Sequence, residues 1–277
     1  MMKNLIRGMI MLSAVGGAVS LRAQTPPSAP TAPAQAAPAA QAPESAPTVD
    51  EIVQKHLAAV GGKEAISKVK SLSMETSAQV MGTEAPGTTV VLDGVGFKSE
   101  TNFNGMKIIT CYTDKGGWTV NPMAGGSDPT PMPEDQYKMG KNQIYVGGGL
   151  YDYAARGSKV QLVGKDDKAY KIKLTTSDSV DWEYVIDSSS YLIKTMTAKG
   201  KMQDQDVVIT SNFSDYRKTD TGYLIPYSID LDIGGQFSLS IAVKKVELNP
   251  TIDPAVFAMP KSAPPSEPAK PAASTTQ

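Results

Sequence analysis

The chain of 277 residues is poor in the side chains that form reaction centres and cross-links. It contains one cysteine, Cys111, and one histidine, His56. A single thiol cannot form an internal disulfide, so the fold must be stable from its core alone. One imidazole without ligands at metal spacing is typical of a helix face rather than a zinc site. The sequence also lacks a nucleophile elbow and a phosphate-binding loop. We therefore expect no catalytic residues, no metal and no cofactor.

A strong net charge is missing as well. The 27 basic and 28 acidic side chains give a net charge of −1, which becomes −4 when the first 24 residues are left out. Such a balance argues against nucleic acid as a partner and against strong docking onto anionic lipid heads. The carboxylate pairs Asp166–Asp167 and Asp204–Asp206 lie beside lysines in turn-like stretches, which is typical of solvated hairpin tips rather than acid–base centres.

Long hydrophobic runs are absent except at the N-terminus. "GMIMLSAVGGAVSL" follows Lys3 and Arg7 and is shorter than the roughly 20 residues that span a bilayer. The pattern predicts a signal peptide over residues 1–24, cleaved before Leu21 or before Gln24. An uncleaved anchor is the alternative, for which Gly16 and Gly17 are poorly suited. We expect a periplasmic protein whose mature chain has no transmembrane span.

Two segments rich in proline and alanine flank the body of the chain. Residues 25–48 and 260–277 offer little to bury, and their prolines break any long helix. They are expected to be a disordered linker and a disordered tail. The body between them, residues 49–259, has a size that suits one β-rich domain.

Two short helices are predicted at the start of the body. Residues 48–60 can be capped by Thr48 or Asp50, and Gly61 with Gly62 stops the helix. A second helix is predicted over residues 63–70. The first helix carries its apolar residues at helical spacing, on one stripe made of Ile52, Val53, His56, Leu57 and Val60.

After Ser71 the apolar residues alternate with polar ones, which is the period of a half-buried strand. The alternation is clearest over residues 227–243, where Gly234 and Gly235 predict a hairpin turn. Short links of this kind predict about nine to eleven antiparallel strands. Residues 121–157 are too rich in proline and glycine to be strand. Their second half is expected to be a short helix or a lid-like loop, anchored by Tyr145, Leu150, Tyr151 and Tyr153.

A long sheet with one apolar face must cover that face, and two helices and a loop are modest cover. The predicted fold is therefore mainly β, a strongly curved antiparallel sheet or unclosed β-barrel with short helices over its hollow. An apolar hollow can hold a hydrocarbon ligand. Alternatively, the thirteen methionines and the tyrosines fill it and nothing binds there.

Several stretches resemble the periplasmic outer-membrane lipoprotein-sorting group of the lipoprotein carrier (LolA-like) superfamily. They are "HLAAVGGKEAISKVKSL", "GGWTVNP", "LYDYAARGSKVQLVGKDD", "YVIDSSSYLIKT", "GYLIPYSI" and "VELNPTIDPAVFAMP". The resemblance extends from about Val49 to Pro260 and rests on order and spacing. It implies an unclosed sheet whose hollow binds acyl chains without catalysis or cofactor. It also implies an interior arginine that latches a lid. Arg156 borders the expected lid loop, although no motif aligns it with that role.

The pattern and the resemblance together predict a carrier or sensor for the acyl chains of a lipid or lipoprotein, or for another hydrophobic molecule. A non-catalytic module that contacts envelope proteins, with its hollow unused, is the alternative. Lid movement is expected to pivot on Gly147, Gly148 and Gly149. The residues expected to bury hydrocarbon lie on the apolar face of the sheet: Trp182, Tyr184, Ile186, Tyr227, Ile229, Leu231, Phe237, Leu239 and Ile241.

Overall fold

The computed structural model describes residues 46–261, apart from residues 81, 125, 203–204 and 236. The predicted signal peptide, most of the predicted linker and most of the predicted tail lie outside these residues. Among the described helices, none combines the length and the apolar character needed to cross a bilayer.

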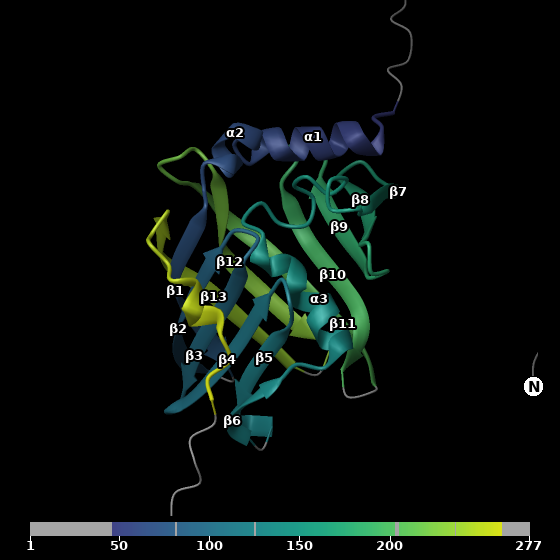
Figure 1. The fold of residues 1–277 in the computed structure, drawn as a ribbon. Helices are drawn as coiled ribbons and strands as arrows, with labels where there is room; N and C mark the ends of the chain where they lie inside the picture. The colour runs from purple at the N-terminus through teal and green to yellow at the C-terminus, as the bar shows by residue number, and fades with distance from the viewer. Residues whose placement is uncertain (1–45, 81, 125, 203–204, 236, 262–277) are drawn as a thin grey trace, which may run out of the picture. The chain divides into compact units, whose positions relative to one another are not determined.

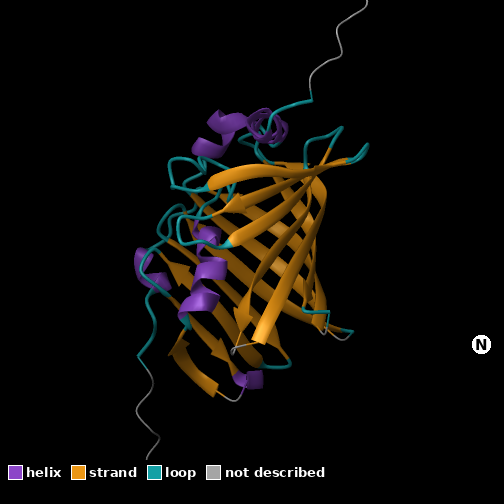
Figure 2. Ribbon diagram, turned by 90° about the vertical axis from the view of Figure 1, so that its right-hand side faces the viewer, coloured by secondary structure: helices purple, strands orange, loops and turns teal. Residues whose placement is uncertain are grey.

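Thirteen antiparallel strands form one sheet in the order β6-β5-β4-β3-β2-β1-β13-β12-β11-β10-β9-β8-β7 (Figure 1). The end strands β6 and β7 do not pair with each other, so the curved sheet stays open (Figure 2). The predicted mainly β, strongly curved and unclosed antiparallel sheet is confirmed, with more strands than the nine to eleven expected. The strands are β1 (Ser71–Val80), β2 (Thr83–Leu92), β3 (Gly96–Phe103), β4 (Met106–Thr113), β5 (Gly117–Asn121), β6 (Gly126–Pro131), β7 (Lys159–Lys165), β8 (Ala169–Thr175), β9 (Asp181–Asp187), β10 (Ile193–Met202), β11 (Gln205–Lys218), β12 (Leu224–Ile233) and β13 (Phe237–Leu248).

The middle of the sheet is the ladder between β1 and β13, which are the first and the last strand along the chain. β1 pairs with β13 from Leu72↔Leu248 to Gln79↔Ser240, with a bulge between Glu75 and Thr76. All other neighbours in the sheet are consecutive in the chain. The sheet is therefore two meanders, β1–β6 and β7–β13, joined along this one ladder.

Helix α1 (Val49–Ala59) begins with a capping box. The N–H of Glu51 donates to Thr48 Oγ1 (3.3 Å), and the N–H of Thr48 donates to Glu51 Oε2 (2.7 Å). Gly61, at φ 115°, leads into α2 (Gly62–Ser67). Figure 1 shows both helices lying across one end of the sheet. The predicted apolar stripe is buried: Ile52, Val53, His56, Leu57 and Val60.

Helix α3 (Glu134–Gly140) and the 3-10 turn η2 (Lys141–Ile144) lie against the face that we call the inner face. Two glycines allow this close approach. A Cβ added at Gly140 would lie 2.0 Å from Tyr112 Cζ of β4, and one added at Gly200 of β10 would lie 2.0 Å from Met139 Sδ of α3. The helix therefore bridges two strands that are far apart in the sheet order.

The prediction that residues 121–157 contain no strand was wrong for β6. Its Pro129 and Pro131 cannot donate to a ladder, but β6 is an end strand, where one row of backbone groups needs no partner. The expected short helix is α3, which begins before the second half of this segment, and residues 145–158 are loop and turn.

The opposite, outer face carries the C-terminal segment of the described chain. The 3-10 turn η3 (Pro254–Phe257) packs Phe257 into a cluster with Ile109, Cys111 and Trp118. Trp118 Nε1 donates to the carbonyl of Phe257 (2.8 Å). This strap covers β3 to β5 from outside and leaves the inner face as the place for a ligand.

Candidate functional site

The inner face keeps a set of half-buried apolar side chains at the end of the sheet remote from α1. β12 starts beside α1, where the N–H of Leu224 donates to the carbonyl of Val60, and it runs away from that helix. Three directly opposed pairs between β12 and β13 form the centre of the set. Phe103 of β3 packs against a small buried cluster that also contacts the β13 residues. We call these seven side chains the open apolar face: Phe103, Ile229, Leu231, Ile233, Phe237, Leu239 and Ile241.

Six members of the open apolar face are cross-strand neighbours on β12 and β13, and Phe103 adjoins them through the cluster of Ala78, Val80 and Ala85. Directly opposed side chains in an antiparallel pair have Cβ atoms about 4.5–5.5 Å apart. Small residues adjoin them on β1 and β2, where Ala78 and Ala85 add no bulk above the sheet. A contiguous set of apolar side chains that keep part of their surface accessible suits a site where a ligand, a membrane or a partner is bound.

The nine residues predicted to bury hydrocarbon fall into separate parts of the inner face. Five belong to the open apolar face: Ile229, Leu231, Phe237, Leu239 and Ile241. Trp182, Tyr184 and Ile186 lie in the largest core cluster, beneath residues of α1, with only 9, 3 and 0 % of their surface exposed. Tyr227 is half-buried between these parts, and the Arg217 guanidinium stacks over its ring at 4.4 Å. The open apolar face is therefore the part that presents surface to a ligand in this structure.

The three glycines predicted as lid hinges lie in the loop after η2. A Cβ added at Gly147 would lie 2.5 Å from Tyr151 Cγ, and one at Gly149 would lie 2.3 Å from Tyr184 Oη. Gly148 has φ 69°, which favours glycine. These positions thus have local packing reasons for glycine, and their role as hinges stays a prediction.

Arg156 holds this loop in place. Its Nη2 donates to the carbonyls of Gly148 (2.8 Å) and Gly149 (3.0 Å) and also to that of Tyr151. Its guanidinium lies 4.2 Å from the centroid of the Tyr145 ring. The contacts tie the end of the loop to its beginning.

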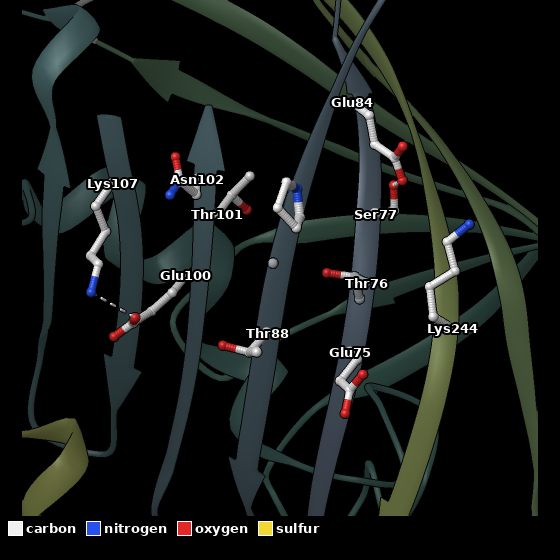
Figure 3. Close-up of a pocket in the computed structure, with 12 residues that line it drawn as sticks. Glu75, Thr76, Ser77, Glu84, Thr88, Glu100, Thr101, Asn102, Lys107 and Lys244 are labelled. Atoms are coloured by element: carbon white, nitrogen blue, oxygen red, sulfur yellow. Dashed lines mark hydrogen bonds and ion pairs between the residues drawn. The ribbon is translucent and has the colours of Figure 1, made fainter. Parts of the chain in front are cut away.

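A polar depression of about 490 Å³ lies on the outer face, across β1 to β4 and β13 (Figure 3). β2 and β3 pair only from Gly87↔Thr101 onward, although β2 begins at Thr83 and β3 continues to Phe103. Pro86 has no N–H to give to β3, which fits the end of the ladder at this point. The charged side chains that line the depression have both signs: Glu75, Glu84, Glu100, Lys107 and Lys244.

The one thiol is placed for packing rather than for reaction. Cys111 is fully buried, and its Sγ lies 3.4 Å from the carbonyl of Phe257. Burial raises the pKa of Cys111 to about 11, so the thiol stays protonated at neutral pH. Among the described residues, no group of three or more His, Cys, Asp and Glu side chains is arranged to hold a metal ion.

Two members of the open apolar face were missed as site residues. Ile233 continues the alternation of β12 and could have been included on that ground. Phe103 precedes Asn104-Gly105, a pair with positive φ at both residues and a strong hairpin signal. The hairpin could be recognised from the sequence. The sequence does not show that Phe103 packs near the β13 residues across β1 and β2.

The fold is shared with solved structures. A LolA superfamily protein from Nitrosomonas europaea is 12% identical at a TM-score of 0.51, covering 77% of this chain and 98% of that chain. A DUF1329 family protein from Desulfovibrio piger is 13% identical at a TM-score of 0.50, covering 76% and 97%. A putative outer membrane lipoprotein-sorting protein domain from Vibrio parahaemolyticus is 13% identical at a TM-score of 0.48, covering 75% and 94%.

At these identities the similarity concerns the fold alone, and at that level the resemblance found in the sequence is confirmed. No protein-family model matches the chain. No curated protein matches it either.

Proposed function

We propose that the protein is an exported carrier or sensor that binds the acyl chains of a lipoprotein, or another hydrophobic ligand, on the open apolar face. The observation that carries the proposal is the contiguous, half-buried set of five aliphatic and two aromatic side chains on the inner face. Two further arguments support it. The fold is that of LolA superfamily proteins, and the N-terminal sequence predicts a signal peptide, which would direct the chain to the periplasm.

Burial of one acyl chain supplies enough free energy for useful affinity. A chain of about 15 methylenes contributes roughly 12 kcal/mol at about 0.8 kcal/mol each. Association costs at least about 4 kcal/mol in lost freedom of motion. At most about 8 kcal/mol then remains, which corresponds to a dissociation constant of about one micromolar or weaker. Such binding is reversible, as a carrier or a sensor requires.

The test compares two variants that place glutamine on opposite faces of β13. Leu239→Gln puts an amide into the open apolar face. Ser238→Gln puts the same group at the preceding residue, whose side chain is exposed on the outer face. Displacement of a fluorescent fatty acid measures affinity, and near-ultraviolet circular dichroism checks the fold. Placing an unpaired amide against hydrocarbon costs about 1–3 kcal/mol. We expect binding to weaken about tenfold or more in Leu239→Gln and to change less than twofold in Ser238→Gln.

Native mass spectrometry of protein taken from the cell envelope gives an independent measurement, in which a co-purifying lipid is expected. Recovery without any lipid, together with no binding of the fatty-acid probe, would refute the proposal. Equal weakening in both glutamine variants would show that the probe does not bind on the inner face.

A second candidate function is a non-catalytic envelope protein-interaction or regulatory module. The polar depression on the outer face favours it, because lysine and glutamate side chains of both signs suit a polar protein surface. A photo-crosslinking residue at position 244 distinguishes the two functions. One dominant protein adduct in cells, with no lipid bound to the inner face, would support the second candidate.

A further inference from the structure

A small polar pocket lies apart from the open apolar face, where the segment between β6 and β7 crosses from one half of the sheet to the other. Its volume is about 130 Å³. The turn after β4 contributes Asp114, η2 contributes Lys141, and the turn between β8 and β9 contributes Asp178. Arg156 and Tyr145 complete the part of the lining that matters here.

Three buried polar atoms of this lining, on two side chains, have no hydrogen-bond partner within the described part of the chain. They are Nη1 of Arg156 and both carboxylate oxygens of Asp178, of which Oδ2 forms an ion pair with Lys141. The other end of each group is engaged, since Arg156 Nη2 donates to loop carbonyls and Lys141 Nζ lies 2.7 Å from Asp178 Oδ2. The Thr176 hydroxyl at the edge of the pocket donates to the carbonyl of Val180 (3.2 Å). Buried polar groups in folded proteins are nearly always paired, and these two side chains call for a bound partner.

The charges around the pocket determine what kind of group can fill it. Arg156 and Lys141 are cationic, and Asp114 and Asp178 are anionic. Burial raises the pKa of Asp178, but the Lys141 ammonium and the neighbouring hydrogen-bond donors together lower it by more, so the carboxylate is ionised at neutral pH. An anion would face two carboxylates and a cation would face two cations. A neutral group that both accepts and donates hydrogen bonds avoids both conflicts.

We propose that this pocket binds a neutral amide group, whose carbonyl oxygen accepts from Arg156 Nη1 and whose N–H donates to Asp178 Oδ1. The volume equals that of about four water molecules at roughly 30 Å³ each, which admits an amide or a single peptide unit. The amide can belong to a free small molecule or to an extended polypeptide. The inference does not depend on acyl-chain binding, because the two sites share no residue.

The experiment titrates the isotope-labelled protein with isosteric probes and follows the Arg156 side-chain N–H signals by nuclear magnetic resonance. Acetamide is the probe, with acetate and ethylammonium as charged controls. A ligand of four non-hydrogen atoms is expected to bind in the millimolar range. Acetate and ethylammonium are expected to bind at least tenfold more weakly. N-methylacetamide separates the two sources, since tighter binding than acetamide points to a polypeptide and weaker binding to a free primary amide.

Three variants complete the test. Asp178→Ala removes the acceptor and Arg156→Lys removes the Nη1 donor, and each is expected to weaken acetamide binding tenfold or more. Asp167→Ala makes the same change as the first variant at an exposed position outside the pocket lining and is expected to stay within twofold. If Asp178→Ala does not fold, acetamide binding by Arg156→Lys alone tests the proposal.

The proposal is overturned if acetamide binds no better than acetate, or if neither Asp178→Ala nor Arg156→Lys weakens it. The pocket then holds only water that bridges the two groups. Fatty-acid displacement, measured on the same samples, reports separately on the open apolar face.

Discussion

Replacing Gly140 with alanine tests whether α3 packs against the inner face. Helix propensity alone predicts a gain of about 0.5–1 kcal/mol, because alanine stabilises a helix relative to glycine. Packing predicts the opposite. The added Cβ would lie 2.0 Å from Tyr112 Cζ and 2.2 Å from its Oη, whereas non-bonded carbon atoms sit about 3.5–4.0 Å apart. The helix and the strand must separate by roughly 1.5 Å, and inserting extra bulk into a packed core typically costs about 1–3 kcal/mol.

The net expectation is a loss of about 1–2 kcal/mol in the free energy of unfolding, measured by urea denaturation. A domain of this size should lose roughly 2–8 °C in Tm. Gly126→Ala is the matched control, because Gly126 lies in the end strand β6 with no atom within 4 Å of the added Cβ. That variant is expected to stay within about 0.5 kcal/mol of the parent.

A smaller side chain at position 112 makes the steric cause explicit. In the Tyr112→Leu background the ring is gone, so Gly140→Ala should cost less than it does in the parent, and a double-mutant cycle measures the difference. If Gly140→Ala is as stable as the parent, α3 does not sit against β4. The inner face would then be open as far as Tyr112, and the area available to a ligand would be larger than described.

Two further predictions concern the ends of the fold. His56 is buried and its Nδ1 lies 2.9 Å from the carbonyl of Tyr191, so Nδ1 carries the hydrogen. Burial lowers the pKa of His56 from its ordinary value of 6.5, and the unfolded chain therefore takes up the proton first as the pH falls. Between about pH 7 and pH 8 the free energy of unfolding should be nearly constant. Below pH 6.5 it should fall by up to about 1.4 kcal/mol per pH unit, and His56→Leu should remove that slope. An unchanged slope in urea titrations at several pH values would contradict this. Phe257→Ala should cost about 3–5 kcal/mol and expose Trp118 to fluorescence quenchers, because the ring is buried on the outer face. The exposed neighbour Val256 gives the control, and equal effects of Val256→Ala and Phe257→Ala would show that the strap is not held by that ring.

Much of the local structure could be read from the sequence because its signals are local. The capping residue Thr48 and the buried stripe of α1 follow from helical spacing. The hairpin of β12 and β13 follows from strict alternation around Gly234 and Gly235. In each case the side-chain pattern and the turn chemistry agree, and little depends on distant parts of the chain.

The parts that could not be predicted depend on contacts between distant residues. Alternation in β9 shows that Trp182, Tyr184 and Ile186 share a face, but not that α1 closes that part of the face while β12 and β13 stay open. The close packing of Gly140 on β4 and of Gly200 under α3 cannot be predicted from a single sequence, because the sequence does not distinguish these two glycines from glycines in turns. Arg156 is similar, since its acceptors are loop carbonyls whose positions depend on the whole fold.

The ladder between β1 and β13 places the oldest and the newest parts of the growing chain side by side. Leu72 meets Leu248 across nearly the whole length of the domain, so the sheet cannot close its centre until the last strand has been made. A polypeptide that ends before β13 would lack a strand from the middle of the sheet rather than from its edge. The two meanders would then not be joined, and each would have an additional unpaired edge strand. Completion of synthesis and completion of the sheet are thereby coupled.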